Sequence, residues 1–233
     1  MQKKDFRQLF SLITSLALIL FFLITAVHFW CFNQAFYDKE HSKLTLYGKS
    51  IPEHIGITEG QLKDLTAFTL AYLNDKDATL DLQMEVKGQI REVYTDDEKA
   101  HMIDVRNLNL AANHLWVISL LIIVGYVVFC LIKKYPLSDL YCSYIKVLKY
   151  GLLILAVLGT WILIDFDSFW TSFHHVFFAG NDLWILDLRK DILIMIVPPE
   201  FFNHLVVTIT VTFFVLLLSP VLLYWLFVKR KTI

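Results

Sequence analysis

The sequence predicts a membrane all-α protein with four transmembrane helices and a small extracellular α+β cap. Its 233 residues are 57% apolar and have a mean hydropathy of +0.56, which is above the range of ordinary soluble domains. Four apolar runs approach or exceed the roughly 20 residues that cross a bilayer, where a helix satisfies its own backbone hydrogen bonds. The basic residues also cluster in alternate connections, as they do in multi-pass membrane proteins.

The charge distribution sets the orientation of the four spans. The two tails and the hairpin between the second and third spans, with their flanks, hold ten Lys or Arg and only two acidic residues. The positive-inside rule places these parts in the cytoplasm, and four spans then place both termini there. The other two connections face outward and are acid-rich, which argues against a nucleic-acid partner. We expect a multi-pass protein of the cell membrane.

The apolar runs divide the chain into eight segments. The first span is interpreted as an uncleaved anchor, because its apolar run over 8–32 is about twice a signal-peptide core and no small-x-small cleavage site follows. The expected segments are a first transmembrane helix (1–32), an extracellular cap (33–109), a second transmembrane helix (110–132), a cytoplasmic hairpin (133–146), a third transmembrane helix (147–165), an aromatic extracellular or interfacial loop (166–203), a fourth transmembrane helix (204–228) and a cytoplasmic tail (229–233).

The cap carries local signals for both helix and strand. Thr58-Glu-Gly-Gln61 has the form of a capping box, and apolar residues follow it at helical spacing, which predicts a helix over about 59–74. Residues 80–86 alternate between apolar and polar types, and Lys87-Gly88 offers a turn after them, so a β-hairpin is expected. Residues 42–48 are a further strand candidate.

A second capping box, Thr95-Asp-Asp-Glu98, predicts the start of a long helix. No Pro or Gly follows until Gly125, so this helix can run directly into the second span. A straight helix would raise His101 about 14 Å above Leu110, at a rise of 1.5 Å per residue. Because that is high for a group that acts at the membrane surface, we expect a tilt or break near Asn107–Asn109.

The 166–203 connection is unusually apolar for a loop. Aromatic residues recur in it at helical spacing, and a Pro-Pro pair at 198–199 closes it. Apolar segments between spans are typical of interfacial or re-entrant structure, and Trp and Phe are common at headgroup depth. We expect this loop to lie under the cap. The aromatic stripe consists of Phe166, Phe169, Trp170, Phe173 and Phe177.

His101 is the first candidate for chemistry. Glu98, His101 and Asp104 lie at i, i+3 and i+6, within an arc of roughly 120° on one helix face. A carboxylate beside a histidine can hold its tautomer and raise its pKa. The alternative is a capped helix in which Glu98 only caps and His101 is an ordinary polar residue.

His174 is the second candidate. It lies one turn from Trp170 and from Phe177 and Phe178, and Asp167 is two turns earlier on nearly the same face. An aromatic, partly dry pocket keeps an imidazole neutral and able to accept a proton. The alternative is an interfacial histidine that directs a ring nitrogen to water.

Metal and thiol chemistry find little support in the sequence. There is no HExxH motif, and the single Glu98-x-x-His101 lacks the second copy of a di-iron site. The three cysteines form no CxxC pair, and no serine or cysteine has an evident base in its own segment. We therefore expect no metal, no cofactor and no covalent acyl-enzyme.

Three stretches together resemble the lipoprotein intramolecular transacylase family of Gram-positive bacteria. Each motif alone is weak, but their order and their expected placement outside the membrane make the resemblance specific over nearly the whole chain. The stretches are Glu98-x-x-His101-Met-x-Asp104-Val-Arg106, then Phe173-His174-x-x-Phe177-Phe178 with Asn181-Asp182-x-Trp184, and Asp191-x-Leu-Ile leading to Pro199-Glu-Phe-Phe202.

The resemblance implies an activity and its residues. The family moves the sn-2 acyl chain of a diacylglyceryl lipoprotein onto the amine of the N-terminal cysteine, which gives the lyso form. Two histidines at the junction of cap and membrane carry the reaction. By their positions in these motifs, the two histidines are His101 and His174. His174 is preferred to His175 because family members have one histidine after the phenylalanine. Diacylated lipoproteins and membrane lipid are then the partners, and the oligomeric state is left open.

The chemistry needs orientation more than a protein nucleophile. Amine and ester lie on one molecule and close an eight-membered ring, so a positioned proton carrier is sufficient. We expect His101 as the base and His174 as its partner or oxyanion donor, and the sequence also allows the reverse order. The supporting residues are expected to be Glu98, Asp104, Arg106 and Asp167, and the substrate pocket is expected to be formed by Trp170, Phe173, Phe177, Phe178 and Trp184.

Two other functional classes are considered. The first is a non-enzymatic membrane protein whose cap binds an extracellular partner, and the state of a lipoprotein N-terminus with and without the protein would distinguish it from an enzyme. The second is a small transporter, which would need ionisable groups at mid-membrane. The four spans have none away from their ends, so a transporter is disfavoured.

Overall fold

The computed structural model describes residues 3–76 and 79–227, so the expected cytoplasmic tail at 229–233 lies outside the described residues. The chain divides into two compact units. One, the helical unit, comprises Met1–His28, Ala112–Phe169 and Thr208–Ile233. The other, the cap unit, comprises Phe29–Ala111 and Trp170–Val207.

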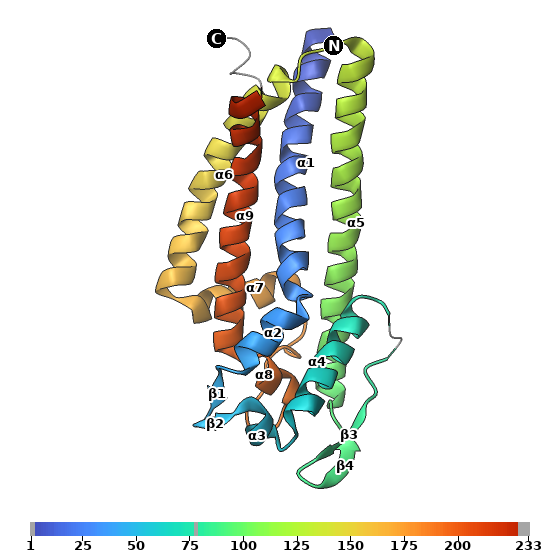
Figure 1. Ribbon diagram of the computed structural model, residues 1–233, viewed down its shortest axis with the longest axis vertical. Helices are drawn as coiled ribbons and strands as arrows, with labels where there is room; N and C mark the ends of the chain where they lie inside the picture. The colour runs from blue at the N-terminus through green and yellow to red at the C-terminus, as the bar shows by residue number, and fades with distance from the viewer. Residues whose placement is uncertain (1–2, 77–78, 228–233) are drawn as a thin grey trace. The chain divides into compact units, whose positions relative to one another are not determined.

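Four long helices supply the helical unit. They are α1 (Lys3–Cys31), α5 (Asp96–Lys133), α6 (Ser138–Ile164) and α9 (Pro199–Phe227), and Figure 1 shows them as the four longest helices of the chain. Each is long and apolar enough to cross a membrane. Many of their apolar side chains face outward, including Leu131, Leu163 and Ile164 at 72–81% exposure, which suits contact with lipid. The prediction of four spanning helices is confirmed.

Aromatic and hydroxyl side chains join these helices in pairs. In the α1–α5 pair, the rings of Phe10 and Tyr126 lie 5.1 Å apart, and Trp116 Nε1 donates to Thr25 Oγ1 at 2.9 Å. In the α6–α9 pair, the Tyr144 hydroxyl donates to the Leu217 carbonyl at 2.6 Å. A hydrogen bond that bridges two helices fixes their register more sharply than lipid-like aliphatic contacts do.

The cap unit mixes short helices with two small sheets. Each sheet is a pair of antiparallel strands, and the two sheets are separate. The elements are α2 (Gln34–His41), β1 (Thr45–Leu46), β2 (Lys49–Ser50), α3 (Ile51–Ile55), α4 (Glu59–Leu73), β3 (Gln83–Val86), β4 (Gln89–Glu92), the main part of α7 (Phe166–Phe177), and α8 (Ile192–Ile196), together with one end each of α1, α5 and α9.

Local sequence signals account for several of these elements. Thr58 and Gln61 form both hydrogen bonds of the capping box that starts α4, as expected. The β3–β4 hairpin turns at Lys87 and Gly88, whose φ angles of 53° and 78° are those of a type I′ turn, which matches the twist of the strands. The strand expected over 42–48 is shorter, because only Thr45–Leu46 pairs, with β2.

The core of the cap unit draws on both halves of the chain. Leu62 and Leu65 of α4 pack with Tyr94 and with Ile192 and Ile196 of α8, and all five side chains are almost fully buried. The expected interfacial loop thus contains a core element of the cap. The first outer segment alone would leave this apolar surface exposed to water, at a cost of about 25 cal/mol per Å².

α5 runs without interruption from Asp96 to Lys133, so the break expected near Asn107–Asn109 is absent. The side chain of Asn109 does not compete for the helix backbone, because it donates to the Leu73 carbonyl at 2.8 Å, at the end of α4. α6 begins at Ser138 rather than at 147, because a helix continues past its apolar window as long as polar side chains such as Lys146 can reach solvent.

Candidate functional site

The cap unit brings His101 and His174 together from distant parts of the sequence. His101 lies in the second turn of α5 and His174 near the end of α7, and their ring centroids are 6.2 Å apart. Both side chains are buried, with 7% and 6% of their surface exposed. Phe178 contacts both rings, at 5.1 Å from His101 and 5.5 Å from His174. The two histidines therefore share one aromatic-walled, water-poor site.

One hydrogen bond determines the tautomer of His174. Its Nδ1 lies 2.8 Å from the main-chain carbonyl oxygen of Trp170, one turn earlier in α7. A carbonyl oxygen only accepts, so Nδ1 carries the proton and Nε2 holds the lone pair. Trp184 stacks on the ring at 4.7 Å and 27°, and Trp170 meets it edge-on at 4.7 Å. His174 is thus a neutral, oriented imidazole with a basic Nε2.

His101 is held differently. Its Nδ1 is buried and has no hydrogen-bond partner among the described residues. A buried N–H without an acceptor costs about 1–3 kcal/mol, so the proton is better placed on Nε2. Burial, helped by the neighbouring His174 and opposed by Asp104, lowers the pKa of His101 to about 4. Burial also lowers the pKa of His174, against the effect of the Trp170 carbonyl. Both imidazoles are neutral at neutral pH.

Glu98 is fully buried but is not paired with His101. Its carboxylate accepts from the main-chain N–H of Thr95 at 2.7 Å and from that of Leu193 at 2.6 Å. The first bond completes the expected capping box, which the Thr95 hydroxyl closes by accepting from the Glu98 N–H at 3.3 Å. The second bond ties the start of α8 to the start of α5. Burial raises the pKa of Glu98, and these N–H donors oppose the shift.

The other expected supporting residues have separate partners. Asp104 accepts from Asn181 Nδ2 at 3.0 Å, which joins α5 to the loop after α7. Arg106 pairs with Asp75 and lies over the Tyr72 ring at 4.7 Å. Both interactions hold the histidine-bearing turns of α5 against the cap. Asp167 lies in the first turn of α7, in the part that belongs to the helical unit.

The expected pocket aromatics surround His174. Phe173 stacks on Trp170 at 5.4 Å and contacts Phe177 at 4.7 Å, while Phe177 itself is half exposed. Trp184 Nε1 is buried and has no partner among the described residues, so a donor stands free beside the imidazole. Sequence reasoning missed Phe202, which packs on Trp170 at 4.3 Å. Its only signal was its place at the end of the third family motif.

A second polar cluster has a structural role. His204 Nδ1 lies 2.6 Å from Glu40, which also accepts from Lys43 at 2.9 Å. His41 Nε2 lies 2.8 Å from the Ile196 carbonyl, at the end of α8. These contacts join α2 to α8 and to the start of α9. The sequence assigned no function to these histidines, and their partners account for them without one.

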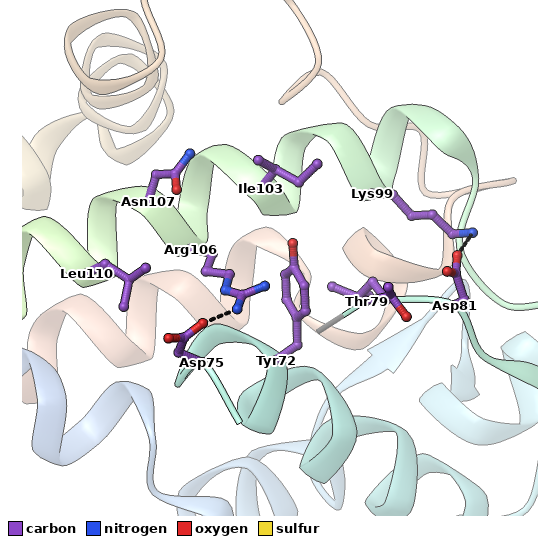
Figure 2. Close-up of a pocket in the computed structure, with 10 residues that line it drawn as sticks. Tyr72, Asp75, Thr79, Asp81, Lys99, Ile103, Arg106, Asn107 and Leu110 are labelled. Atoms are coloured by element: carbon purple, nitrogen blue, oxygen red, sulfur yellow. Dashed lines mark hydrogen bonds and ion pairs between the residues drawn. The ribbon is translucent and has the colours of Figure 1, made fainter. Parts of the chain in front are cut away.

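A cavity of about 490 Å³ lies between the end of α4 and the start of α5 (Figure 2). Its α5 lining includes Lys99, Ile103 and Leu110, about half a helical turn around from His101. The charges in it are already neutralised, because Lys99 binds Asp81 at 2.6 Å and Arg106 pairs with Asp75. This cavity is separate from the histidine site and has no free charge to hold a ligand.

No cluster of three or more His, Cys, Asp or Glu side chains in the described part of the chain is placed to hold a metal ion. The chemistry available at the histidine site is proton transfer by two neutral imidazoles and hydrogen-bond donation in a dry pocket. Such a pocket strengthens electrostatic interactions with a reacting group.

The buried histidines predict a loss of stability in acid. A group whose pKa is lower in the folded than in the unfolded state contributes stability that is complete above pH 6.5 and lost as the pH falls toward 4. For His101 the full effect is on the order of 3 kcal/mol. We expect the Tm of the detergent-solubilised protein to fall between pH 7.5 and 4.5, and to fall less in His101→Gln. Glu98, whose pKa is raised by burial, stabilises both proteins as the pH falls and so opposes the effect of the histidine. An equal pH dependence of Tm in wild type and His101→Gln would contradict the lowered pKa of His101.

Comparison with known proteins places this site in context. The family model described as lipoprotein intramolecular transacylase Lit matches residues 12–202. The membrane integral lipoprotein intramolecular transacylase Lit from Bacillus cereus has a similar solved structure, with a TM-score of 0.82, 21% identity and 99% of both chains covered. Two structures of that protein with one histidine replaced, by arginine or by alanine, match with TM-scores of 0.74 and 0.75 at 22% identity, over 99% of this chain and 95% and 97% of theirs. No curated protein matches the chain. These similarities confirm the expected fold class.

Proposed function

Because the chain belongs to the lipoprotein intramolecular transacylase family, we propose that it moves the sn-2 acyl chain of a diacylglyceryl lipoprotein onto the amine of the N-terminal cysteine. The product is the lyso-form lipoprotein. One observation carries the proposal beyond the family level: two neutral, buried histidines from α5 and α7 share one aromatic site. A partner-binding protein without enzymatic activity has no need of such a pair, so that alternative is not favoured.

The substrate supplies both reacting groups. The cysteine nitrogen attacks the sn-2 carbonyl carbon, the new N–C bond closes an eight-membered ring, and the C–O bond to glycerol then breaks. Holding the two groups in contact lowers the barrier by several kcal/mol, up to roughly 7–11 in well-oriented intramolecular reactions. Walls built from Trp170, Phe173 and Phe178 suit this task, because they are rigid, apolar and exclude water.

His174 is the proton carrier in this mechanism. Its Nδ1–H is fixed on the Trp170 carbonyl, so Nε2 is free to accept a proton from the attacking nitrogen. The resulting imidazolium then gives that proton to the departing glycerol oxygen. Proton and bonds balance, and neither a cofactor nor a protein nucleophile takes part. This reverses the order expected from the sequence, which made His101 the base.

His101 acts as a neutral hydrogen-bond donor. With its pKa lowered to about 4, it remains uncharged, and its Nε2–H can bond to the ester carbonyl oxygen as negative charge develops there. The free indole N–H of Trp184 is a second donor beside His174. A neutral donor is suitable because it stabilises the oxyanion without giving up its proton to it.

The acidic residues position these groups. Glu98 fixes the start of α5 against α8, so it sets the position of His101 through the helix rather than through its ring. Asp104 does the same through Asn181, and Arg106 through Asp75. For topology, we propose that both termini are cytoplasmic and the cap is extracellular, as the basic tails indicate. A membrane-bound diacylated lipoprotein would then meet the site with its acyl chains in the bilayer.

The direct test is conversion of a defined substrate. Purified full-length protein in lipid nanodiscs is mixed with a synthetic diacylglyceryl lipopeptide that has a free amine. Mass spectrometry with fragmentation is expected to show the same total mass with one acyl chain moved from glycerol to nitrogen. An unchanged fragmentation pattern with well-folded protein would overturn the proposed function. A lipopeptide with an acetylated amine is the control and should not react.

A further inference from the structure

A second cavity in the cap unit combines a buried apolar floor with a cationic rim. It has a volume of about 680 Å³, within the range of small-molecule sites. The floor is made by core side chains, among them Ile55, Val86 and Ile192, which are 1–3% exposed. The rim carries five cations from three segments of the chain: Lys49, Lys87, Arg91, Arg189 and Lys190.

None of the twelve described residues that line this cavity is acidic. That is unexpected from the composition, because residues 33–109 hold 14 acidic and nine basic side chains. Lys49, Lys87, Arg91 and Lys190 form no ion pair with any described residue, and Arg189 has only Asp187 at 3.5 Å. Five like charges around one hollow repel one another and focus a positive potential in it.

The strand geometry explains why basic side chains face this cavity and acidic ones do not. In the β3–β4 ladder, Arg91 pairs with Met84, on the face whose Val86 enters the core, while Glu85 and Glu92 lie on the other face. Glu92 is engaged there by Lys99 at 2.5 Å. Strand alternation thus turns the cation toward the cavity and the acids away from it.

Lys87 is held in place on the cavity wall. Its main-chain N–H donates to the Gly56 carbonyl at 2.9 Å, and its side-chain stem covers Gly56, where an added Cβ would lie 2.4 Å from Lys87 Cγ. Gly56 has a φ of 86° at the end of α3, so the backbone also requires glycine there. A lysine packed in this way has lost part of its side-chain freedom before any ligand arrives, which favours binding.

We propose that this cavity binds a small organic phosphate, for which glycerol phosphate is the test ligand. Phosphate concentrates negative charge and acceptor oxygens in a small volume, which suits several cations converging on one hollow, and the planar fork of Arg91 can bind it through two N–H groups. The apolar floor and Tyr47 at the rim, whose ring lies 5.4 Å from that of His54, would cover the carbon skeleton. This site is independent of acyl transfer. Glycerol phosphate occurs free, in polymers and in lipid headgroups, and the test separates the sources.

The test is titration calorimetry with sn-glycerol 3-phosphate. Purified full-length protein in an uncharged detergent and low salt is expected to bind one equivalent saturably, and more weakly in 0.5 M NaCl. The double variant Lys87→Gln/Arg91→Gln should bind at least about tenfold more weakly, since it loses two charge-assisted contacts. The matched control Lys39→Gln/Lys63→Gln removes the same charge elsewhere on the cap and should bind like wild type.

Two outcomes would overturn the proposal: no saturable binding by wild type up to 10 mM, or an equal loss of affinity in the two double variants. If Lys87→Gln/Arg91→Gln does not fold, Lys190→Gln on the exposed loop is used in its place. This variant is also expected to bind glycerol phosphate more weakly than wild type, by a smaller factor. Repeating the titration in nanodiscs identifies the source. Competition in discs that contain phosphatidylglycerol, but not in discs of phosphatidylcholine alone, assigns a lipid headgroup, and equal binding in both assigns a soluble or polymeric glycerol phosphate.

Discussion

His174→Ala is expected to lower the rate of acyl transfer at least about 100-fold, the usual scale for losing a positioned acid or base. The variant should still reach the membrane, because the removed ring lies among aromatic side chains that can partly close over it. The measurement is the initial rate of lyso-lipopeptide formation by mass spectrometry, with protein amount checked in the membrane fraction. His175→Ala is the matched control, since His175 is exposed and next in sequence.

Glutamine variants separate the two histidine roles. His101→Gln keeps an N–H donor near the carbonyl, so it should retain more activity than His101→Ala. His174→Gln cannot carry a proton and should be as inactive as His174→Ala. If instead His174→Gln stays active and His101→Gln does not, His101 is the base, in the order that the sequence suggested. If His175→Ala alone abolishes activity, the assignment of His174 is wrong.

The elements that the sequence predicted well are those with short-range causes. The capping box at Thr58 and Gln61 and the turn at Lys87-Gly88 need only neighbours within four residues, and both formed as expected. The four spans follow from length and apolarity alone. The meeting of His101 and His174 has no local cause, and it was expected only through the family resemblance. The structure places the two rings in contact distance of one phenylalanine.

What the sequence could not predict depends on tertiary partners. Spacing on one helix face suggested that the Glu98 carboxylate orients His101. The carboxylate instead accepts a hydrogen bond from the main-chain N–H of Leu193, which is distant in sequence. The expected break in α5 followed from a membrane depth argument, whereas the side chain of Asn109 found an acceptor in α4 and left the helix intact. The tautomer of His174 depends on a carbonyl one turn away, which periodicity does not reveal. Long-range hydrogen bonds decided each of these cases.

Acyl donor and acceptor are expected to be one molecule, and no transfer between molecules should be detectable. The reason is chemical: in the proposed mechanism neither histidine stores an acyl group, so the chain has no covalent carrier between two substrates. Two lipopeptides are mixed with the enzyme in nanodiscs. One has an isotope-labelled sn-2 chain and a blocked amine, and the other has an unlabelled chain and a free amine. Fragment masses should show only unlabelled chain on nitrogen.

The two peptides must compete for the same site for this result to be informative. A free-amine lipopeptide with a labelled sn-2 chain is therefore run alongside, and it should place its label on its own nitrogen at the full rate. The blocked peptide should slow that reaction as an inhibitor, which shows that it is bound. Label on the nitrogen of the second peptide would contradict direct attack through the eight-membered ring. It would require a protein nucleophile that holds the acyl chain while one substrate leaves and the next one enters, and the search would then turn to the side chains within reach of His174 Nε2.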